Sequence, residues 1–149
     1  MKNPPDKEII KFLKENKVAT VCCAESNIPF CFNCFYALME DDMCLVFKSD
    51  KNTKHGKILA ENFDVAGTVT VPFFTLGKLK GIQFGGRVRN DKSIVSKALW
   101  FYYGRFPYAM TVPGKIYIIE LDIVKLTDNS KGFTNKQIWN RVYAEYANI

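Results

Sequence analysis

The sequence has one histidine, His55, and four arginines among its 21 basic residues, and both shortages restrict the sites that it can build. One histidine excludes a metal site made of several imidazoles, and a Ser–His–Asp triad would have to use it. Proteins that read duplex DNA rely on arginine forks at base edges, so a lysine-dominated net charge of +6 indicates diffuse positive charge or a phosphate-bearing ligand. The charge by itself leaves these two interpretations open.

Several motifs of common enzyme classes are also missing. The sequence contains no GxSxG, GxGxxG or GxxxxGK[ST] pattern, which disfavours hydrolase, dinucleotide-fold and P-loop chemistry. No apolar run approaches the ~18 residues that a membrane-spanning helix needs. The charged N-terminal segment lacks the apolar core of a signal peptide. We therefore expect a soluble, cytoplasmic protein that does not bind a membrane.

The five cysteines are odd in number, which disfavours a disulfide framework. Cys31 and Cys34 have the CxxC spacing of redox and zinc sites, and Cys22 and Cys23 are adjacent. On a strand, residues at either spacing point to opposite faces, so neither pair converges on one metal or one disulfide. We predict reduced cysteines that pack as small hydrophobic side chains, and no metal site.

The chain of 149 residues is 48% hydrophobic and 24% charged, which suits one globular domain over residues 1–149. Alternating apolar residues and turn signals predict strands over residues 17–25, 30–39, 43–47, 64–71, 79–89 and 115–126. Capping residues predict three helices, one from Asn3 to Asn16, one after Thr53 and one after Asp91, and the tail 133–146 is expected to be partly helical. Gly85-Gly86 permits a bulge. These elements predict an all-β or α+β fold, a curled sheet or small barrel with helices at its ends.

The densest group of phosphate-friendly side chains lies between Lys48 and His55. A strand there is followed by the start of a helix, where free backbone N–H groups, hydroxyls and ammonium groups come together. An anion would be well bound in this segment. A solvated, lysine-rich loop is an equally good interpretation of the composition alone.

Several segments, taken in order, carry a resemblance that covers nearly the whole chain. They are Phe35-Tyr36, Thr53-Lys54-His55, Val65-Ala66-Gly67-Thr68-Val69, Gly81-Ile82-Gln83-Phe84 with Gly86, Arg105-Phe106-Pro107, Leu121-Asp122, Thr127-Asp128-Asn129, Gly132-Phe133 and Ile138-Trp139-x-Arg141. Their order and spacing resemble the pyridoxamine 5′-phosphate oxidase-like family of FMN-binding split barrels, and more closely a small, poorly characterised bacterial subgroup of it. The resemblance implies a split β-barrel of about six antiparallel strands with short flanking helices.

The resemblance also implies which residues hold the cofactor. The family binds the FMN phosphate at a strand-to-helix junction and lays the flavin ring against the second strand. A glutamine of the fifth strand and residues from the partner of a homodimer complete the family's site. In this chain the corresponding residues are Lys48, Ser49, Thr53, Lys54 and His55 for the phosphate, Asn33, Cys34 and Phe35 for the ring, Gln83 on the fifth strand, and Trp139 and Arg141 across the dimer interface.

Three positions in the expected site depart from the family's pattern. His55 replaces a second Lys or Arg, Asn33 replaces an Arg, and a strict register would place Gly81 rather than Gln83 at the glutamine position. The C-terminal arginines that grip pyridoxine phosphate are not clearly present, so vitamin B6 oxidation is not implied. For Trp139 and Arg141, an interface tryptophan with an exposed arginine is an equally good interpretation.

The sequence thus supports three functional hypotheses. The first is a homodimeric FMN-binding flavoprotein, with the cofactor near the dimer interface, that acts as an oxidoreductase on a small organic substrate; the flavin supplies the redox chemistry and no catalytic residue can be named. The second is a non-enzymatic protein on the same fold that stores or senses haem or flavin. The third, which we consider the weakest, is a nucleic-acid-binding module that uses the lysine surplus.

Overall fold

The computed structural model of the chain describes residues 3–72, 76–131 and 135–141. These residues form seven strands and three α-helices, joined by turns and short 3-10 segments. In chain order the helices and strands are α1 (Lys7–Glu15), β1 (Val18–Glu25), β2 (Ile28–Met39), β3 (Cys44–Ser49), α2 (Lys54–Leu59), β4 (Asp64–Thr70), β5 (Lys80–Arg89), α3 (Val95–Arg105), β6 (Lys115–Asp128) and β7 (Lys136–Asn140).

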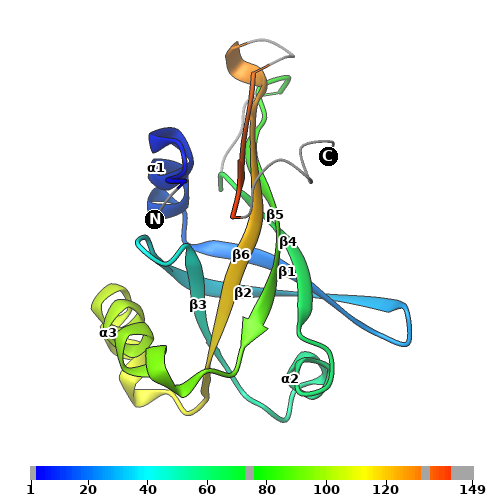
Figure 1. The fold of residues 1–149 in the computed structure, drawn as a ribbon, viewed down its shortest axis with the longest axis vertical. Coiled ribbons are helices and arrows are strands. Elements are labelled where there is room, and N and C mark those ends of the chain that lie inside the picture. The colour runs from blue at the N-terminus through cyan, green and yellow to red at the C-terminus, as the bar shows by residue number, and fades with distance from the viewer. Residues whose placement is uncertain (1–2, 73–75, 132–134, 142–149) are drawn as a thin grey trace.

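The strands form one antiparallel sheet in the order β3-β2-β1-β4-β5-β6-β7, and β3 also pairs with β6. That pairing closes β1 to β6 into a six-stranded barrel and leaves β7 outside the ring, beside β6 (Figure 1). β6 borders three strands because it is 14 residues long: its first half pairs with β3 and its second half with β7, while β5 follows its other edge. The predicted split barrel with short flanking helices is confirmed.

Turns and glycines set the register of the sheet. β1 and β2 are joined by Ser26 and Asn27, both with positive φ, as the two-residue turn of a tight hairpin requires. The predicted irregularity at Gly85-Gly86 is present as a shift in the β5–β6 register. A Cβ atom at Gly86 would lie 2.3 Å from the carbonyl oxygen of Glu120, so only glycine allows the two backbones to approach this closely.

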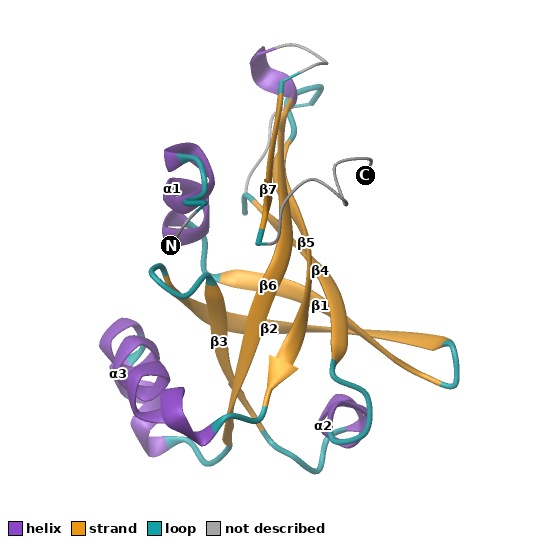
Figure 2. Ribbon diagram, viewed as in Figure 1, coloured by secondary structure: helices purple, strands orange, loops and turns teal. Residues whose placement is uncertain are grey.

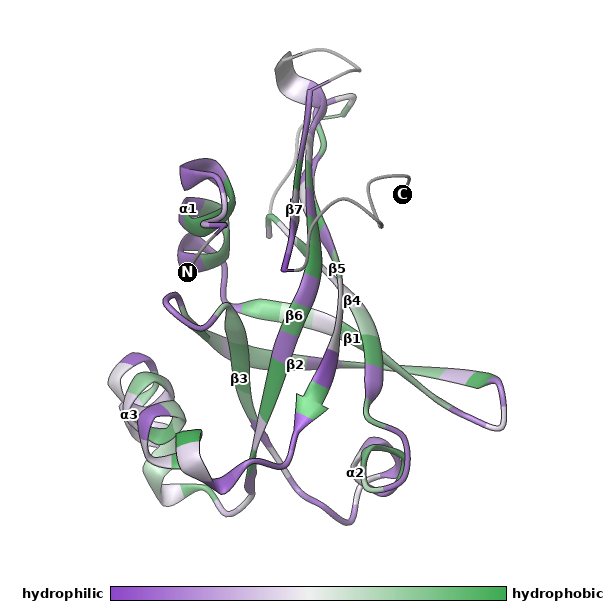
Figure 3. Cartoon of the chain, in the orientation of Figure 1, coloured by the Kyte–Doolittle hydropathy of each residue, from purple (hydrophilic) through white to green (hydrophobic). Residues whose placement is uncertain are grey.

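The main core fills the barrel and extends under α1. Ile9, Phe12 and Leu13 are almost fully buried on one side of this helix, and the Tyr36 hydroxyl of β2 donates to the Leu13 carbonyl at 2.8 Å. Figure 3 shows the green, apolar side of α1 turned toward the sheet and its purple, charged side turned away. Burial of this apolar face, rather than helix propensity, is what stabilises so short a helix.

A second, smaller core lies where α3 covers β2, β3 and β6 from outside the barrel. Ala98, Tyr102 and Phe106 pack there against Met39 and Val46. Figure 2 shows α1, α2 and α3 at the periphery of the sheet, each beside a different part of it. This arrangement leaves much of the outer face of β1, β2, β4 and β5 without a covering helix.

Two expectations for the termini need correction. Asp6, not Asn3, caps α1, because its carboxylate accepts the Glu8 amide, and the helix begins at Lys7. In the tail 133–146 the described residues contain the strand β7 instead of a helix, because an edge of β6 is available for pairing; the remainder of the tail lies outside the described residues. Among the described residues no helix is long and apolar enough to span a membrane.

Candidate functional site

The candidate site lies where β2 and β3 separate. The two strands pair only from Tyr36–Phe47 to Met39–Cys44. Before Tyr36, β2 pairs with β1 alone, and after Phe47, β3 continues beside β6. The end of β3 and the start of α2 therefore stand beside an edge of β2 that has no partner strand among the described residues.

Side chains and backbone groups organise the turn from β3 into α2. The predicted cap Thr53 is confirmed: its hydroxyl accepts the Gly56 amide at 3.1 Å and donates to the Asp50 carbonyl at 2.7 Å. A Cβ atom at Gly56 would lie 2.5 Å from the Lys51 carbonyl oxygen, so glycine is required for the loop to fold against the helix. The amides of Lys54 and His55 precede the first hydrogen bond within α2 and remain available to a ligand.

His55 is held by two neighbours at this junction. Its Nε2 lies 2.7 Å from Ser49 Oγ, and its ring stacks on Phe32 with centroids 3.8 Å apart and an angle of 9° between the planes. Burial lowers the pKa of His55 below its ordinary value, so the imidazole is neutral at pH 7. The adjacent Lys54 places its ammonium 4.7 Å from the centroid of the Phe30 ring. Ser49 and His55 are thus in direct contact, while Lys54 lies over Phe30, two positions from Phe32 on the same face of β2.

Lys48 does not join this group. Successive side chains of a strand point to opposite faces, and Lys48 therefore faces away from Ser49. Its ammonium donates to the Ala109 carbonyl at 2.8 Å and to the Tyr103 hydroxyl at 2.9 Å, beside α3. These contacts give Lys48 a structural role on the other side of β3.

The residues expected beside a flavin ring divide between the two faces of β2. Asn33 and Phe35 point outward and line a pocket of about 760 Å³ over β1, β2 and β4. Thr20 of β1 donates to Asn33 Oδ1 at 2.7 Å. Cys34 points the other way, into the core, where burial raises its pKa to about 12 and keeps the thiol protonated. The outer pocket is therefore lined by Asn33 and Phe35 but not by Cys34.

Gln83 lies on the same outer face, farther along the sheet. It pairs with Thr68 of β4, which pairs with Thr20, which in turn pairs with Asn33. The four residues form a polar row across β2, β1, β4 and β5. Gln83 is exposed and does not line the pocket.

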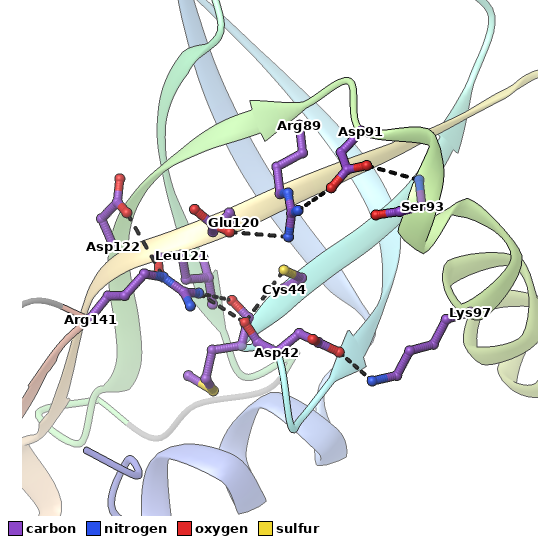
Figure 4. Close-up of polar contacts among 11 residues, drawn as sticks. Asp42, Cys44, Arg89, Asp91, Ser93, Lys97, Glu120, Leu121, Asp122 and Arg141 are labelled. Atoms are coloured by element: carbon purple, nitrogen blue, oxygen red, sulfur yellow. Dashed lines mark hydrogen bonds and ion pairs between the residues drawn. The ribbon is translucent and has the colours of Figure 1, made fainter. Parts of the chain in front are cut away.

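Trp139 and Arg141 make contacts within their own chain. Trp139 is 3% exposed, and its indole N–H donates to the Asn3 carbonyl at 2.7 Å. Arg141 donates to the carbonyls of Leu121, Asp42 and Met43 at 2.8–2.9 Å and so joins β6 to the β2–β3 turn (Figure 4). Because its guanidinium bonds three carbonyls of its own chain, Arg141 is not the exposed arginine of the second alternative.

Lys57, the other basic residue of α2, faces a different region. It lines a separate pocket of about 550 Å³ on the far side of the helix, together with Lys51, Lys92 and Lys115. The helix therefore directs Lys54 and His55 toward β2 and Lys57 away from it.

Sequence reasoning missed the aromatic residues Phe30 and Phe32, which contact Lys54 and His55. The signal was present, because alternation along β2 puts both rings on the inward face with Tyr36. What the sequence lacked was the position of α2 relative to that face, which depends on contacts between segments far apart in the chain.

The fold and the junction define a split-barrel protein. With 20% identity and a TM-score of 0.66, 83% of the chain superposes on 57% of Atu2129, a larger Agrobacterium tumefaciens protein of unknown function. An FAD-binding protein from Mycobacterium smegmatis (TM-score 0.66, 14% identity, 81% of this chain and 92% of that one) shares the fold. So does HutZ, the haem storage protein from Vibrio cholerae (TM-score 0.62, 13% identity, 79% and 89%).

Sequence comparison identifies the family. No protein-family model matches the chain. A UPF0306 protein from Photorhabdus laumondii is 35% identical over 136 residues, which cover 89% of this chain and 94% of that protein. A UPF0306 protein from Yersinia enterocolitica is 32% identical over 149 residues, covering 97% and 100%. The chain belongs to the UPF0306 family.

Proposed function

We propose that this chain binds FMN and uses it in an oxidoreductase reaction on a small organic substrate. The observation that carries the proposal is the contact of Ser49 with His55, next to Lys54 at the start of α2, where β2 and β3 separate. The related folds described as an FAD-binding protein and a haem storage protein support a planar, anionic cofactor on this architecture.

The groups at the junction fit a phosphate. Lys54 supplies a cation, Ser49 a hydroxyl and His55 an imidazole, while the first two amides of α2 supply N–H donors. Thr53 is already committed to capping the helix, so its role is to hold those amides in place. The carboxylate of Asp50, which accepts the Asn52 amide at 2.8 Å, adds one negative charge to the same loop.

The outer pocket lies on the opposite face of β2 from Lys54 and His55, so the proposed cofactor would pass around the unpaired edge of β2 to place its ring there. The pocket's volume of about 760 Å³ lies within the range of small-molecule sites, ~300–1,000 Å³. Phe35 offers an apolar surface that is 49% exposed, and Asn33 offers an amide for hydrogen bonds to ring heteroatoms. When bound, the flavin supplies the electron transfer; Asn33 and Phe35 orient the ring, and Lys54 and His55 fix the phosphate.

Haem is the second candidate, because one related fold is described as a haem storage protein. His55 is the single histidine and is engaged by Ser49 and Phe32, so it would have to leave both contacts to ligate iron. A visible spectrum of the reconstituted protein distinguishes the two cofactors, since flavin and haem absorb in different bands.

Titration with FMN tests the proposal directly. Charge-assisted bonds to a phosphate contribute ~1.5–3 kcal/mol each, so Lys54→Ala should weaken FMN by about tenfold or more. Lys57→Ala is the matched control, because Lys57 is on the same helix but faces the other pocket. Equal affinities for wild type, Lys54→Ala and Lys57→Ala would contradict the proposed phosphate site.

A homodimer is the second part of the proposal. Val18 and Phe35 face each other across β1 and β2 and are 45% and 49% exposed, and Phe35 contacts Phe106 next to the exposed Tyr108. An apolar patch beside a polar row is a common basis for an isologous contact. Sedimentation should give a dimer at micromolar concentration, whereas a monomer at that concentration would refute this part.

A further inference from the structure

Two cysteines that are nine positions apart in the sequence lie directly opposite each other in the β1–β2 hairpin. Cys22 of β1 is the register partner of Cys31 of β2. The Tyr36 amide donates to the Lys17 carbonyl at 2.9 Å, which makes Lys17–Tyr36 a hydrogen-bonded pair. Pair types alternate along an antiparallel ladder, so Cys22–Cys31 is a non-hydrogen-bonded pair.

Side chains meet most closely at pairs of this type. Cα atoms there are about 4.5 Å apart, inside the roughly 4.4–6.8 Å that a disulfide spans. The next such pair in the ladder shows the contact: Thr20 Oγ1 and Asn33 Oδ1 are 2.7 Å apart. By the period of two, Cys22 and Cys31 point to the same outer face as Thr20 and Asn33.

The two thiols have unequal surroundings. Cys31 is exposed, and Cys22 is half-buried. Burial, and next the neighbouring Cys31 thiol, raise the pKa of Cys22. Cys34 and Cys23, in contrast, have no cysteine opposite them, since their partners are Ala19 and Phe30.

The pair lies where the β1–β2 hairpin leaves the rest of the sheet. Cys22 is the last residue of β1 that pairs with β4, and beyond it the two strands of the hairpin pair only with each other. Figure 1 shows the end of this hairpin extending away from the rest of the sheet. A bond between the two sulfurs would join the strands at the point where the hairpin leaves the barrel.

We propose that Cys22 and Cys31 are a thiol oxidation site that closes reversibly into a cross-strand disulfide. With glutathione disulfide as oxidant, the exposed Cys31 thiolate attacks one glutathione sulfur and releases the first glutathione thiolate. Cys22 thiolate then attacks the Cys31 sulfur and expels the second. Two electrons pass from the cysteines to the oxidant, and the two cysteine protons end on the two released glutathiones.

The experiment is oxidation of the purified, reduced, full-length chain with glutathione disulfide, without added flavin. The free thiols should fall from five to three, the mass should fall by that of two hydrogen atoms, and dithiothreitol should reverse both changes. Peptide mapping should place the bond between Cys22 and Cys31. Cys34→Ser should behave as wild type, because Cys34 faces the core on the other side of β2.

The single variants Cys22→Ala and Cys31→Ser should both fail to form an internal disulfide, and Cys22→Ala should instead retain one glutathione on Cys31. Three results would overturn the proposal: five free thiols after oxidation, a wild-type chain that keeps glutathione on Cys31, or a disulfide between two copies. Because no flavin is added, failure of FMN binding leaves this test unaffected.

Discussion

The pH dependence of FMN binding tests whether the His55 imidazole contacts the phosphate of the cofactor. In the protein without ligand, burial holds the pKa of His55 below its ordinary value of ~6.5, so the ring is neutral at pH 7. A phosphate beside the ring favours the protonated form and raises this pKa on binding. The complex then takes up a proton, and affinity increases as the pH falls from 8 to 6. Below the pKa of the free protein no further increase is expected.

The size of the effect follows from the exposure of the site. Two unit charges ~4 Å apart interact by about 4 kcal/mol at an effective dielectric constant of 20. His55 is only partly buried, so solvent screening reduces the coupling to about 1 kcal/mol. That corresponds to a total gain in affinity of roughly fivefold, which is complete only below the pKa of the free protein, so the gain between pH 8 and pH 6 is a part of it.

The matched variant is His55→Gln, which keeps a hydrogen-bonding side chain without a titrating ring. The second pKa of a phosphate ester is about 6, so the ligand itself loses charge over the same range and weakens binding at low pH. The glutamine variant reports that loss alone, and the ratio of wild-type to variant affinity isolates the imidazole. Fluorescence titrations at constant ionic strength measure this ratio, and calorimetry in two buffers measures the proton uptake. Parallel pH profiles for the two proteins would refute the reasoning.

Three further predictions concern the scaffold around the site. Arg105 donates to the carbonyls of Lys14, Asn16 and Tyr36 at 2.5–3.0 Å. Arg105→Met should lower the free energy of unfolding by about 2–3 kcal/mol, less than the sum of three such bonds because some of the freed carbonyls bind water instead. Denaturant unfolding measures this loss, and a value under about 0.5 kcal/mol, typical of an ordinary surface site, would contradict the prediction. Gly67→Ala should lower the free energy of unfolding by about 2 kcal/mol or more, because the new Cβ would lie 2.4 Å from the Thr20 carbonyl oxygen. A variant whose midpoint of thermal unfolding equals or exceeds that of the wild type would contradict this. A Cβ atom at Gly104 in α3 would have no neighbouring atom within 4 Å, so Gly104→Ala should stabilise the protein by up to about 1 kcal/mol. A lower melting temperature of this variant would contradict the prediction.

Local signals in the sequence were enough for β1 to β6 and for the three helices, apart from the first residues of α1. The alternation over residues 115–126 identifies β6, Thr53 identifies the start of α2, and Gly85-Gly86 identifies the irregularity in β5. Each depends on side chains within a few residues of each other, which is why sequence alone predicts them. The tail 133–146 was expected to be partly helical, and its residues 136–140 instead form β7, because pairing with the edge of β6 overrides a weak local preference.

The candidate site was predictable only in part. Ser49, Thr53, Lys54 and His55 lie within seven residues of the sequence, and in the fold Ser49 contacts His55 beside the cap Thr53. The resemblance placed Cys34 beside the ring with Asn33 and Phe35, whereas the period of two turns it to the opposite face of β2. The burial of Trp139 depended on a strand that the sequence did not suggest.

The sequence by itself determined strands β1 to β6, the turns between them and the segment rich in hydrogen-bond donors for a phosphate, since these depend on local conformation and composition. Only the tertiary structure decided three contacts. Lys48 donates to Tyr103 of α3, Phe32 stacks on His55, and Cys22 lies opposite Cys31. These contacts depend on strand register and on the packing of α2 and α3 around the barrel. Register and packing are set by the burial of the whole core at once, so no short segment of the chain encodes them.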